Sequence, residues 1–150
     1  MIKINLGCGY RKEVGHINID NRACVEPDLV ADLNCSIPFK DSSVDKVVAV
    51  DILEHIPIGK TVNLIEEIYR VLKPDGIFFH VTPSTDGRAA FADPTHVSFW
   101  NVLSWVYYVR DEYRKLYDIK AKFAVVELND MVTNEEFKII HTKGIFRAMK

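Results

Sequence analysis

The sequence predicts an α/β protein with a mostly parallel β-sheet, an antiparallel strand pair at its C-terminal end, and reduced helices on one face. Four short runs have the length and bounding residues of strands: 2–6, 16–20, 46–50 and 77–81. The first two alternate apolar and polar residues, whereas a parallel sheet with helices on both faces is apolar on both. Two later runs, 122–128 and 137–147, flank the polar segment 129–136 and indicate the antiparallel pair.

Length and composition are those of a single soluble globular domain, residues 1–150, with 48% hydrophobic and 27% charged residues. The net charge of −2 and the lack of a basic run give no support for nucleic-acid binding. No apolar stretch approaches the roughly 18–20 residues of a membrane span, and the chain begins on a strand, so we expect neither a span nor a signal peptide. Three cysteines without Cys-x-x-Cys spacing and five scattered histidines predict a reduced, cytoplasmic protein without a metal motif.

The stretch 2–20 is the first candidate binding site. Its first strand runs into Gly7-Cys8-Gly9, where glycine allows a sharp turn or a close approach of backbone to a ligand. Its second strand ends on Asp20, and a carboxylate at this position typically binds ribose hydroxyls. A tight turn alone would also account for the glycines. Together, the turn and the carboxylate predict a nucleoside-binding site.

The link between these two strands limits which nucleoside fits. A dinucleotide site needs a third glycine and a helix whose N-terminus holds the pyrophosphate, but Lys12 stands at the glycine position. Only six residues separate Gly9 from the second strand, too few for an ordinary helix. S-adenosylmethionine has a ribose and an adenine but no phosphate, so it is favoured over a dinucleotide or a nucleotide sugar.

Two more strands end on acidic residues. Segment 21–28 is too short for a long helix, and the strand 29–32 that follows ends at Asp32, which either caps a turn or hydrogen bonds an adenine amino group. The apolar run 46–50 indicates a strand buried on both faces. It leads into Asp51-Ile52-Leu53-Glu54-His55, which predicts either a wall of the site or helix capping.

The clearest helix is 59–73, with apolar residues at three- and four-residue steps, and Pro74-Asp75-Gly76 ends it. The next strand, 77–81, contains His80, which we expect to be a hydrogen-bonded core histidine. After the loop 82–95, an aromatic-rich helix is predicted over 98–117, its aromatic stripe packed in the core.

His96 follows that loop, where the roof of a site is expected. An imidazole can take a proton from an acceptor hydroxyl near neutral pH, and Asp93 would orient it. Alternatively, Asp93 is a helix N-cap, Pro94 the first helical residue, and His96 a side chain bonded within the first turn.

Several motifs in order resemble class I S-adenosylmethionine-dependent methyltransferases over residues 2–82: Leu6-Gly7-Cys8-Gly9, Asn18-Ile19-Asp20, Asp32-Leu33, Val44-Asp45-Lys46-Val47-Val48, Glu54-His55-Ile56 and Leu72-Lys73-Pro74-Asp75-Gly76. The resemblance implies a Rossmann-like sheet and methyl transfer from S-adenosylmethionine. The late Asp-Pro-Thr-His stretch is similar to that of short members associated with cell-surface glycan synthesis. The implied acceptor is therefore an oxygen or nitrogen of a small or glycan-like molecule.

Carried over by position, the resemblance assigns roles to eight residues. The backbone of Gly7, Cys8 and Gly9 would approach the methionine part of the cofactor, and Asp20 would accept the ribose hydroxyls. Asp32 and Leu33 would border the adenine, and Asp51 and Ile52 would form the near wall. A member that keeps the fold but acts as a non-catalytic binding or partner subunit is the alternative.

The chain departs from the family in its missing helices, because strand one starts at the N-terminus and both following links are short. We therefore expect self-association, or docking of another protein, on the surface that helices would cover. The polar residues of strands one and two suggest instead that part of this face is solvated. Because these helices are missing, one chain alone need not form the whole cofactor pocket.

Overall fold

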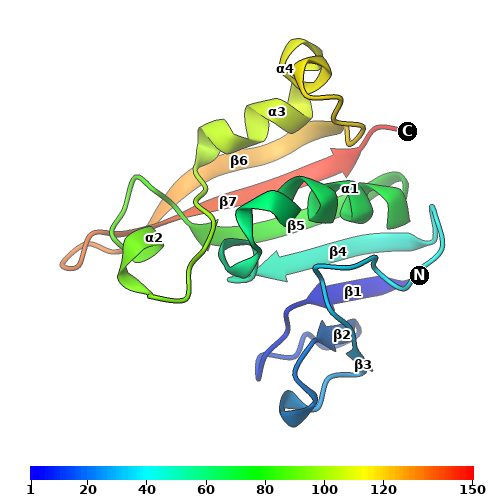
Figure 1. The fold of residues 1–150 in the computed structure, drawn as a ribbon, viewed down its shortest axis with the longest axis horizontal. Helices are drawn as coiled ribbons and strands as arrows, with labels where there is room; N and C mark the ends of the chain where they lie inside the picture. Colours follow the sequence, from blue (N-terminus) through cyan, green and yellow to red (C-terminus); the bar gives the residue numbers. More distant parts are fainter.

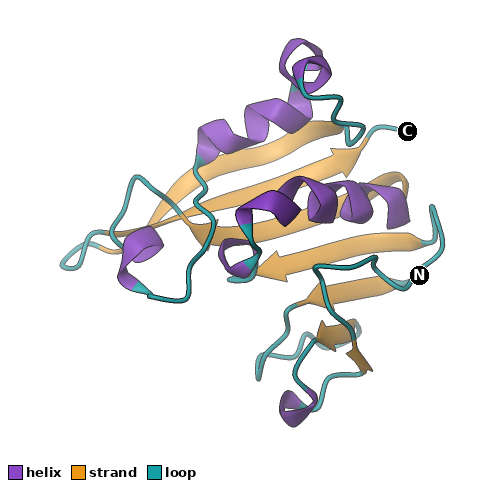
Figure 2. Ribbon diagram, viewed as in Figure 1, coloured by secondary structure: helices purple, strands orange, loops and turns teal.

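The computed structural model describes residues 1–150 and contains one seven-stranded sheet with the order β3-β2-β1-β4-β5-β7-β6 (Figures 1 and 2). The neighbours among β1 to β5 pair in parallel, whereas β7 pairs antiparallel with both β5 and β6. This confirms the predicted fold class. The strands are β1 (Lys3–Leu6), β2 (Ile17–Asp20), β3 (Leu29–Val30), β4 (Val44–Val50), β5 (Leu72–Pro83), β6 (Phe123–Asn134) and β7 (Ile139–Ala148).

Helices are few and short. The longest, α1 (Thr61–Val71), follows a 3₁₀ turn, η3 (Ile58–Lys60), and matches the predicted helix; it ends before Pro74, whose ring disfavours helix in the preceding residue. The others are α2 (Ala89–Ala92), α3 (Val106–Val109), α4 (Asp111–Leu116), η1 (Ala23–Val25), η2 (Leu53–His55) and η4 (Val102–Trp105). Figure 1 shows α1 and α3 over the same face of the sheet, and no helix between β1 and β2. None of the helices combines the length and apolar character that crossing a bilayer requires.

The main core lies between α1 and the covered face of the sheet. Ile4, Val47, Phe78 and Phe146 are paired across four strands and are fully buried. Helix α1 packs on this side through four buried apolar residues, Leu64, Ile65, Ile68 and Val71. Full burial of each such side chain contributes about 1.5–3 kcal/mol, so this layer stabilises the frame that positions the strand ends.

His80 is buried as predicted, but the expectation that it is hydrogen bonded is wrong. Neither ring nitrogen has a partner, and the ring stacks on Trp105 at 4.2 Å between centroids. The His80 ring fits at this position because residue 144 is glycine. A Cβ at residue 144 would overlap the side chains of His80 and Phe146. The imidazole therefore serves as an aromatic packing group.

The helix predicted over 98–117 is instead three short segments, η4, α3 and α4. Trp100 is extended and forms a bridge with Ser84, so the helical region begins only after Asn101. The Asn101 side chain caps η4 together with Ser104, and Arg110 has extended dihedral angles that separate α3 from α4. Trp100 and Trp105 are buried, which confirms part of the predicted aromatic stripe, whereas Phe99, Tyr107 and Tyr113 are exposed. Tyr108 is also buried.

Strands β5 and β6 are longer than predicted, whereas β7 is close to the predicted run 137–147. β6 runs through most of the segment 129–136 that was expected to separate them, and β5 begins at Leu72 and crosses Pro74-Asp75-Gly76. Asp75 adopts a left-handed φ of 61° there, which accommodates the turn signal within an extended segment. The loop 82–95 contains the four-residue helix α2.

Polar residues of β1 and β2 are buried rather than solvated. Asn5 donates a hydrogen bond to Asn18 at 3.0 Å and another to the Arg11 carbonyl, while the Glu13 amide donates to Asn18. These bonds hold the β1–β2 loop over the face where a helix was missing. The expectation of a solvated face is therefore wrong at Asn5 and Asn18, and the loop takes part of the helix's place.

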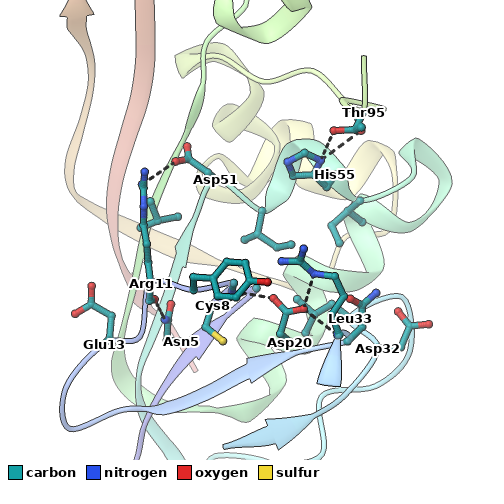
Figure 3. Close-up of a pocket in the computed structure, with 18 of the residues that line it drawn as sticks. Asn5, Cys8, Arg11, Glu13, Asp20, Asp32, Leu33, Asp51, His55 and Thr95 are labelled. Carbon is teal, nitrogen blue, oxygen red and sulfur yellow. Dashed lines mark hydrogen bonds and ion pairs between the residues drawn. The ribbon is translucent and has the colours of Figure 1, made fainter. Parts of the chain in front are cut away.

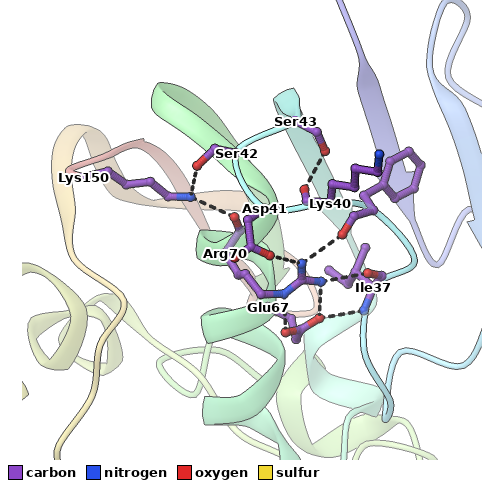
Figure 4. Close-up of polar contacts among 9 residues, drawn as sticks. Ile37, Lys40, Asp41, Ser42, Ser43, Glu67, Arg70 and Lys150 are labelled. Atoms are coloured by element: carbon purple, nitrogen blue, oxygen red, sulfur yellow. Dashed lines mark hydrogen bonds and ion pairs between the residues drawn. The ribbon is translucent and has the colours of Figure 1, made fainter.

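A guanidinium fastens the β3–β4 loop to α1 (Figure 4). Arg70 donates to both oxygens of Glu67 at 2.7 Å, to Asp41 at 2.7 Å, and to the carbonyls of Ile37 and Phe39. These hydrogen bonds from Arg70 lower the pKa of Glu67. The loop that leads away from Asp32 is thus held at a fixed position against the main helix.

Candidate functional site

The carboxyl ends of β1, β2 and β4 border one cavity of about 800 Å³ (Figure 3). All eight residues that the sequence assigned to a cofactor line this cavity: Gly7, Cys8, Gly9, Asp20, Asp32, Leu33, Asp51 and Ile52. A single chain therefore supplies every one of these positions. The cavity volume falls within the roughly 300–1,000 Å³ typical of small-ligand sites.

Gly7 and Gly9 of the turn after β1 are required for different structural reasons. Gly7 has φ +62°, and a Cβ there would overlap the side chain of Ile52. Gly9 has φ +48°, but a Cβ there would meet only the Arg22 guanidinium, at 3.6 Å. Gly7 is thus required by both backbone and space, and Gly9 mainly by backbone. Cys8 between them is buried, and this burial raises the pKa of its thiol.

Asp20 ends β2 and is 5% exposed. Its Oδ2 accepts the Gly9 amide at 2.9 Å, and its Oδ1 accepts the Arg22 amide at 2.9 Å and the Arg22 side chain at 3.3 Å. Burial by itself would raise the pKa of this carboxyl, but the amides of Arg22 and Gly9 and the Arg22 guanidinium lower it overall. Asp20 is therefore ionised, and because a carboxylate has about four lone-pair sites, it can still accept a ligand hydroxyl.

Asp32 and Leu33 form a second wall. Asp32 is exposed, and its Oδ1 accepts the amide and the side-chain N–H of Asn34, both at 2.9 Å, as in an Asx turn. The turn role that the sequence allowed for Asp32 is therefore present, and its Oδ2 makes no hydrogen bond within the protein. Leu33 is buried and offers an apolar surface beside it.

Asp51 and Ile52 form the wall nearest β4. Asp51 has a left-handed φ of 50°, and its carboxylate lies 3.7 Å from Arg11 and 3.7 Å from Nε2 of His141. Arg11 comes from the β1–β2 loop, so this pair links that loop to the end of β4 at the cavity (Figure 3). Sequence reasoning missed Arg11 and Arg22, because nothing in their local pattern fixes where a loop side chain lies.

The residues lining the cavity fit a nucleoside without phosphate groups. An ionised, buried carboxylate lies beside an uncovered glycine backbone, and Leu33 and Ile52 supply apolar walls. No helix begins after Gly9, where a pyrophosphate would need helix N–H groups. Ribose hydroxyls at Asp20 and an adenine against Leu33 are the arrangement that these groups favour.

The predicted catalytic pair, His96 and Asp93, lies beside the cavity and does not line it. His96 is held by Nδ1 bonding to the Ala90 carbonyl at 3.1 Å, and its Nε2 is 3.8 Å from Asp93 Oδ2, longer than a hydrogen bond. Asp93 bonds the Thr95 amide and hydroxyl, and no helix begins after it, so the N-cap alternative is wrong. His55 and Thr95 are the residues from this region that reach the cavity.

Comparison with known proteins places this geometry in context. A family model described as "Methyltransferase domain" matches residues 5–80, about half of the chain. A search of curated protein sequences found no match.

Solved structures share the fold at low sequence identity. A Methanosarcina mazei S-adenosylmethionine-dependent methyltransferase is 18% identical with a TM-score of 0.67, covering 98% of this chain and 92% of its own. A chain from a complex containing the Haloferax volcanii Trm112 methyltransferase activator is 17% identical with a TM-score of 0.68, covering 99% and 82%. The [4+2]-cyclase SpnF is 14% identical with a TM-score of 0.71, covering 98% and 75%.

Proposed function

The chain belongs to the class I S-adenosylmethionine-dependent methyltransferase family, and from this membership we propose that it methylates an oxygen or nitrogen of a small or glycan-like acceptor. S-adenosylmethionine is the cofactor of the family. Its sulfonium already activates the methyl group, so the protein's task is to align acceptor and donor, exclude water and remove a proton where needed.

The observation that carries the proposal is that all eight residues to which the family resemblance assigns a cofactor role line one cavity. Asp20 would accept the ribose hydroxyls, the Gly7–Gly9 backbone would lie along the methionine part, and Leu33 would cover the adenine. Four carboxylates and two guanidinium groups border the cavity: Glu13, Asp20, Asp32 and Asp51, with Arg11 and Arg22. The excess of negative charge favours a cationic sulfonium.

The acceptor would approach from the side of His55 and Thr95. Within this proposal, His96 takes the acceptor proton, because its Nδ1 is engaged by the Ala90 carbonyl and Nε2 keeps a free lone pair. Asp93 would contribute charge near Nε2. The orienting bond comes from Ala90 rather than from Asp93.

A second function is a non-catalytic partner subunit that binds the cofactor without turnover. It is favoured by the single helix-covered face, which leaves half-buried residues of β5 and β7, such as Phe79 and Ile145, on the other side. A likeness to a chain from an activator complex also motivates it. Light scattering over a concentration series tests self-association through this face, and a strict monomer would count against a homo-oligomer.

Two measurements separate these functions. Calorimetry with S-adenosylmethionine and with NAD tests the cofactor, and we expect binding of the first only. Release of S-adenosylhomocysteine is then assayed with a panel of sugars, phenols and amines. Binding with turnover supports the enzyme, whereas binding without turnover on any acceptor supports the partner subunit. Absence of S-adenosylmethionine binding by the folded protein overturns the proposed function.

A further inference from the structure

We propose that Glu54, His55 and His96 form a binding site for one divalent transition-metal ion at the rim of the cofactor cavity. The donor atoms of the three side chains all lie within 4.8 Å of one another. The set of two imidazoles and one carboxylate suits Zn²⁺ and related ions and disfavours Mg²⁺ and Ca²⁺, which prefer oxygen ligands. This site stands apart from the cofactor assignment and does not depend on it.

Backbone hydrogen bonds bring the two parts of the cluster together. Glu54 and His55 lie in η2 after β4, whereas His96 comes from the loop after α2. The carbonyl of Glu54 accepts the amides of Val97 at 2.8 Å and Ser98 at 3.1 Å. These bonds place His96 against His55, with ring centroids 5.0 Å apart in an edge-to-face arrangement. Main-chain hydrogen bonds therefore hold the two backbone segments of the cluster next to each other.

Each histidine is oriented as metal ligands usually are. Nδ1 of His96 contacts the Ala90 carbonyl at 3.1 Å, and Nδ1 of His55 contacts the Thr95 carbonyl at 3.3 Å. A carbonyl can only accept, so each Nδ1 carries the proton and each Nε2 keeps a lone pair. Metal-binding histidines commonly donate their other N–H to a carbonyl or carboxylate in this way.

Glu54 supplies a buried carboxyl group that has no cationic partner within the protein. It is 2% exposed, and its Oε2 accepts the Thr82 hydroxyl at 2.8 Å. No lysine or arginine forms an ion pair with it. A buried carboxylate normally has a paired charge or a metal. The Asp93 carboxylate, 3.8 Å from His96 Nε2, adds negative charge beside the cluster.

Three protein ligands leave one position of a tetrahedral zinc ion open, as in catalytic sites. Zn–N bonds of about 2.0–2.1 Å put ligand atoms roughly 3.4 Å apart, so binding would draw the His96 loop slightly inward. Because His55 also lines the cofactor cavity, the open position would face an acceptor next to the methyl donor. An acceptor hydroxyl bound there would lose its proton more readily, and His96 would then act as a ligand instead of a base.

Zinc titration tests the site directly. The protein is stripped with a chelator in a Cys24→Ser/Cys35→Ser background, since these exposed thiols bind zinc themselves. Zn²⁺ is titrated against a chromophoric chelator, and we expect a 1:1 complex. His55→Asn and His96→Asn should each weaken it by more than roughly 100-fold, because even outer-shell changes cost about 10–100-fold. Thr82→Val, which removes the hydroxyl bonded to Glu54, should weaken it by roughly 10–100-fold.

His16→Asn is the matched control, because His16 lies outside the cluster and should leave zinc affinity unchanged. Circular dichroism verifies that each variant is folded, and the visible spectrum of bound Co²⁺ reports nitrogen and oxygen ligands on the parent protein itself. Absence of a 1:1 complex in the folded parent, or unchanged affinity in both His55→Asn and His96→Asn, would overturn the site. S-adenosylmethionine binding by the metal-free protein is measured in parallel, so that failure of one proposal is distinguished from failure of the other.

Discussion

The carboxylate of Asp20 accepts the backbone N–H of Gly9 at 2.9 Å, so the end of β2 holds the glycine turn that follows β1. The same carboxylate holds the Arg22 amide through its other oxygen. Asp20 thus fixes the two loops that border the cavity and remains ionised beside it. Asp20 therefore both positions the loops that shape the cavity and supplies the negative charge that a ligand can contact.

Asp20→Asn should weaken S-adenosylmethionine binding about tenfold or more. The amide keeps one acceptor for the loops but removes the charge, and a hydrogen bond to a charged group contributes about 1.5–3 kcal/mol. Asp20→Ala should cost at least as much and should also loosen the glycine turn. Calorimetry measures both, with the exposed Asp118→Asn as control. Unchanged affinity in Asp20→Ala would show that Asp20 does not bind the ribose.

Gly7→Ala should be more harmful than Gly9→Ala. Both place a side chain at left-handed φ, which costs about 1–2 kcal/mol, but only at Gly7 does the new Cβ overlap Ile52. Overpacking adds about 1–3 kcal/mol of lost stability. Chemical denaturation compares the two single variants with Gly7→Ala/Ile52→Ala. The double variant removes the overlaps with Cγ1 and Cδ1 of Ile52 but keeps the close approach to its Cβ and the backbone cost, so it should recover only part of the lost stability. Equal destabilisation by both single variants would contradict the contact with Ile52.

His80 should make the fold sensitive to acid at an unusually high pH. Burial lowers its pKa from 6.5 to about 3. Because the folded pKa lies below the unfolded one, the unfolded state binds the extra proton, and stability is full above about pH 6.5 and falls below it. The expected slope is about 1.4 kcal/mol per pH unit between pH 6 and 4, from one proton.

Denaturation curves of the His80→Leu variant, which cannot titrate at this position, should lose that slope. His16→Asn, which changes a histidine outside the core, should retain it. If His80→Leu and the parent protein show parallel pH profiles, the ring has the same pKa in the folded and unfolded states and the burial argument fails.

Local sequence patterns predicted most of the sheet and which strand ends would border the cavity. A strand that ends in Gly7-Cys8-Gly9 and a second that ends in Asp20 place these residues at one sheet edge, because parallel strands end together. Short sequence motifs specify where each strand ends, and the order of the strands in the sheet brings those ends together. The strand-end residues around the cavity could therefore be predicted from local sequence.

Other features depend on contacts between distant segments. The aromatic residues after Ser98 have helical spacing, but the segment is not one helix. Trp100 pairs with Ser84, and Asn101 caps the 3₁₀ helix η4 that begins after it. The proximity of Glu54 and His96 depends on main-chain bonds between their loops, which no sequence spacing indicates. Likewise, the position of Arg11 depends on the buried Asn5–Asn18 pair that holds its loop.

His96→Asn should reduce turnover by roughly 10²–10⁴ while S-adenosylmethionine affinity stays close to normal. His96 does not line the cavity proposed for the cofactor, so its loss should leave binding intact and impair only the step that involves the acceptor. The assay is release of S-adenosylhomocysteine with the acceptor identified by the panel, and calorimetry supplies the affinity. Near-normal turnover would leave His96 as a structural residue bonded to Ala90.

The same assay distinguishes a base from a metal ligand. If His96 acts as a free base, a strong chelator leaves the parent protein's rate unchanged and only the substitution reduces it. If His96 holds a metal ion with Glu54 and His55, the chelator lowers the parent rate toward that of His96→Asn, and added Zn²⁺ restores the parent but not the variant. The two roles use the same Nε2 lone pair, so one of these results must exclude the other.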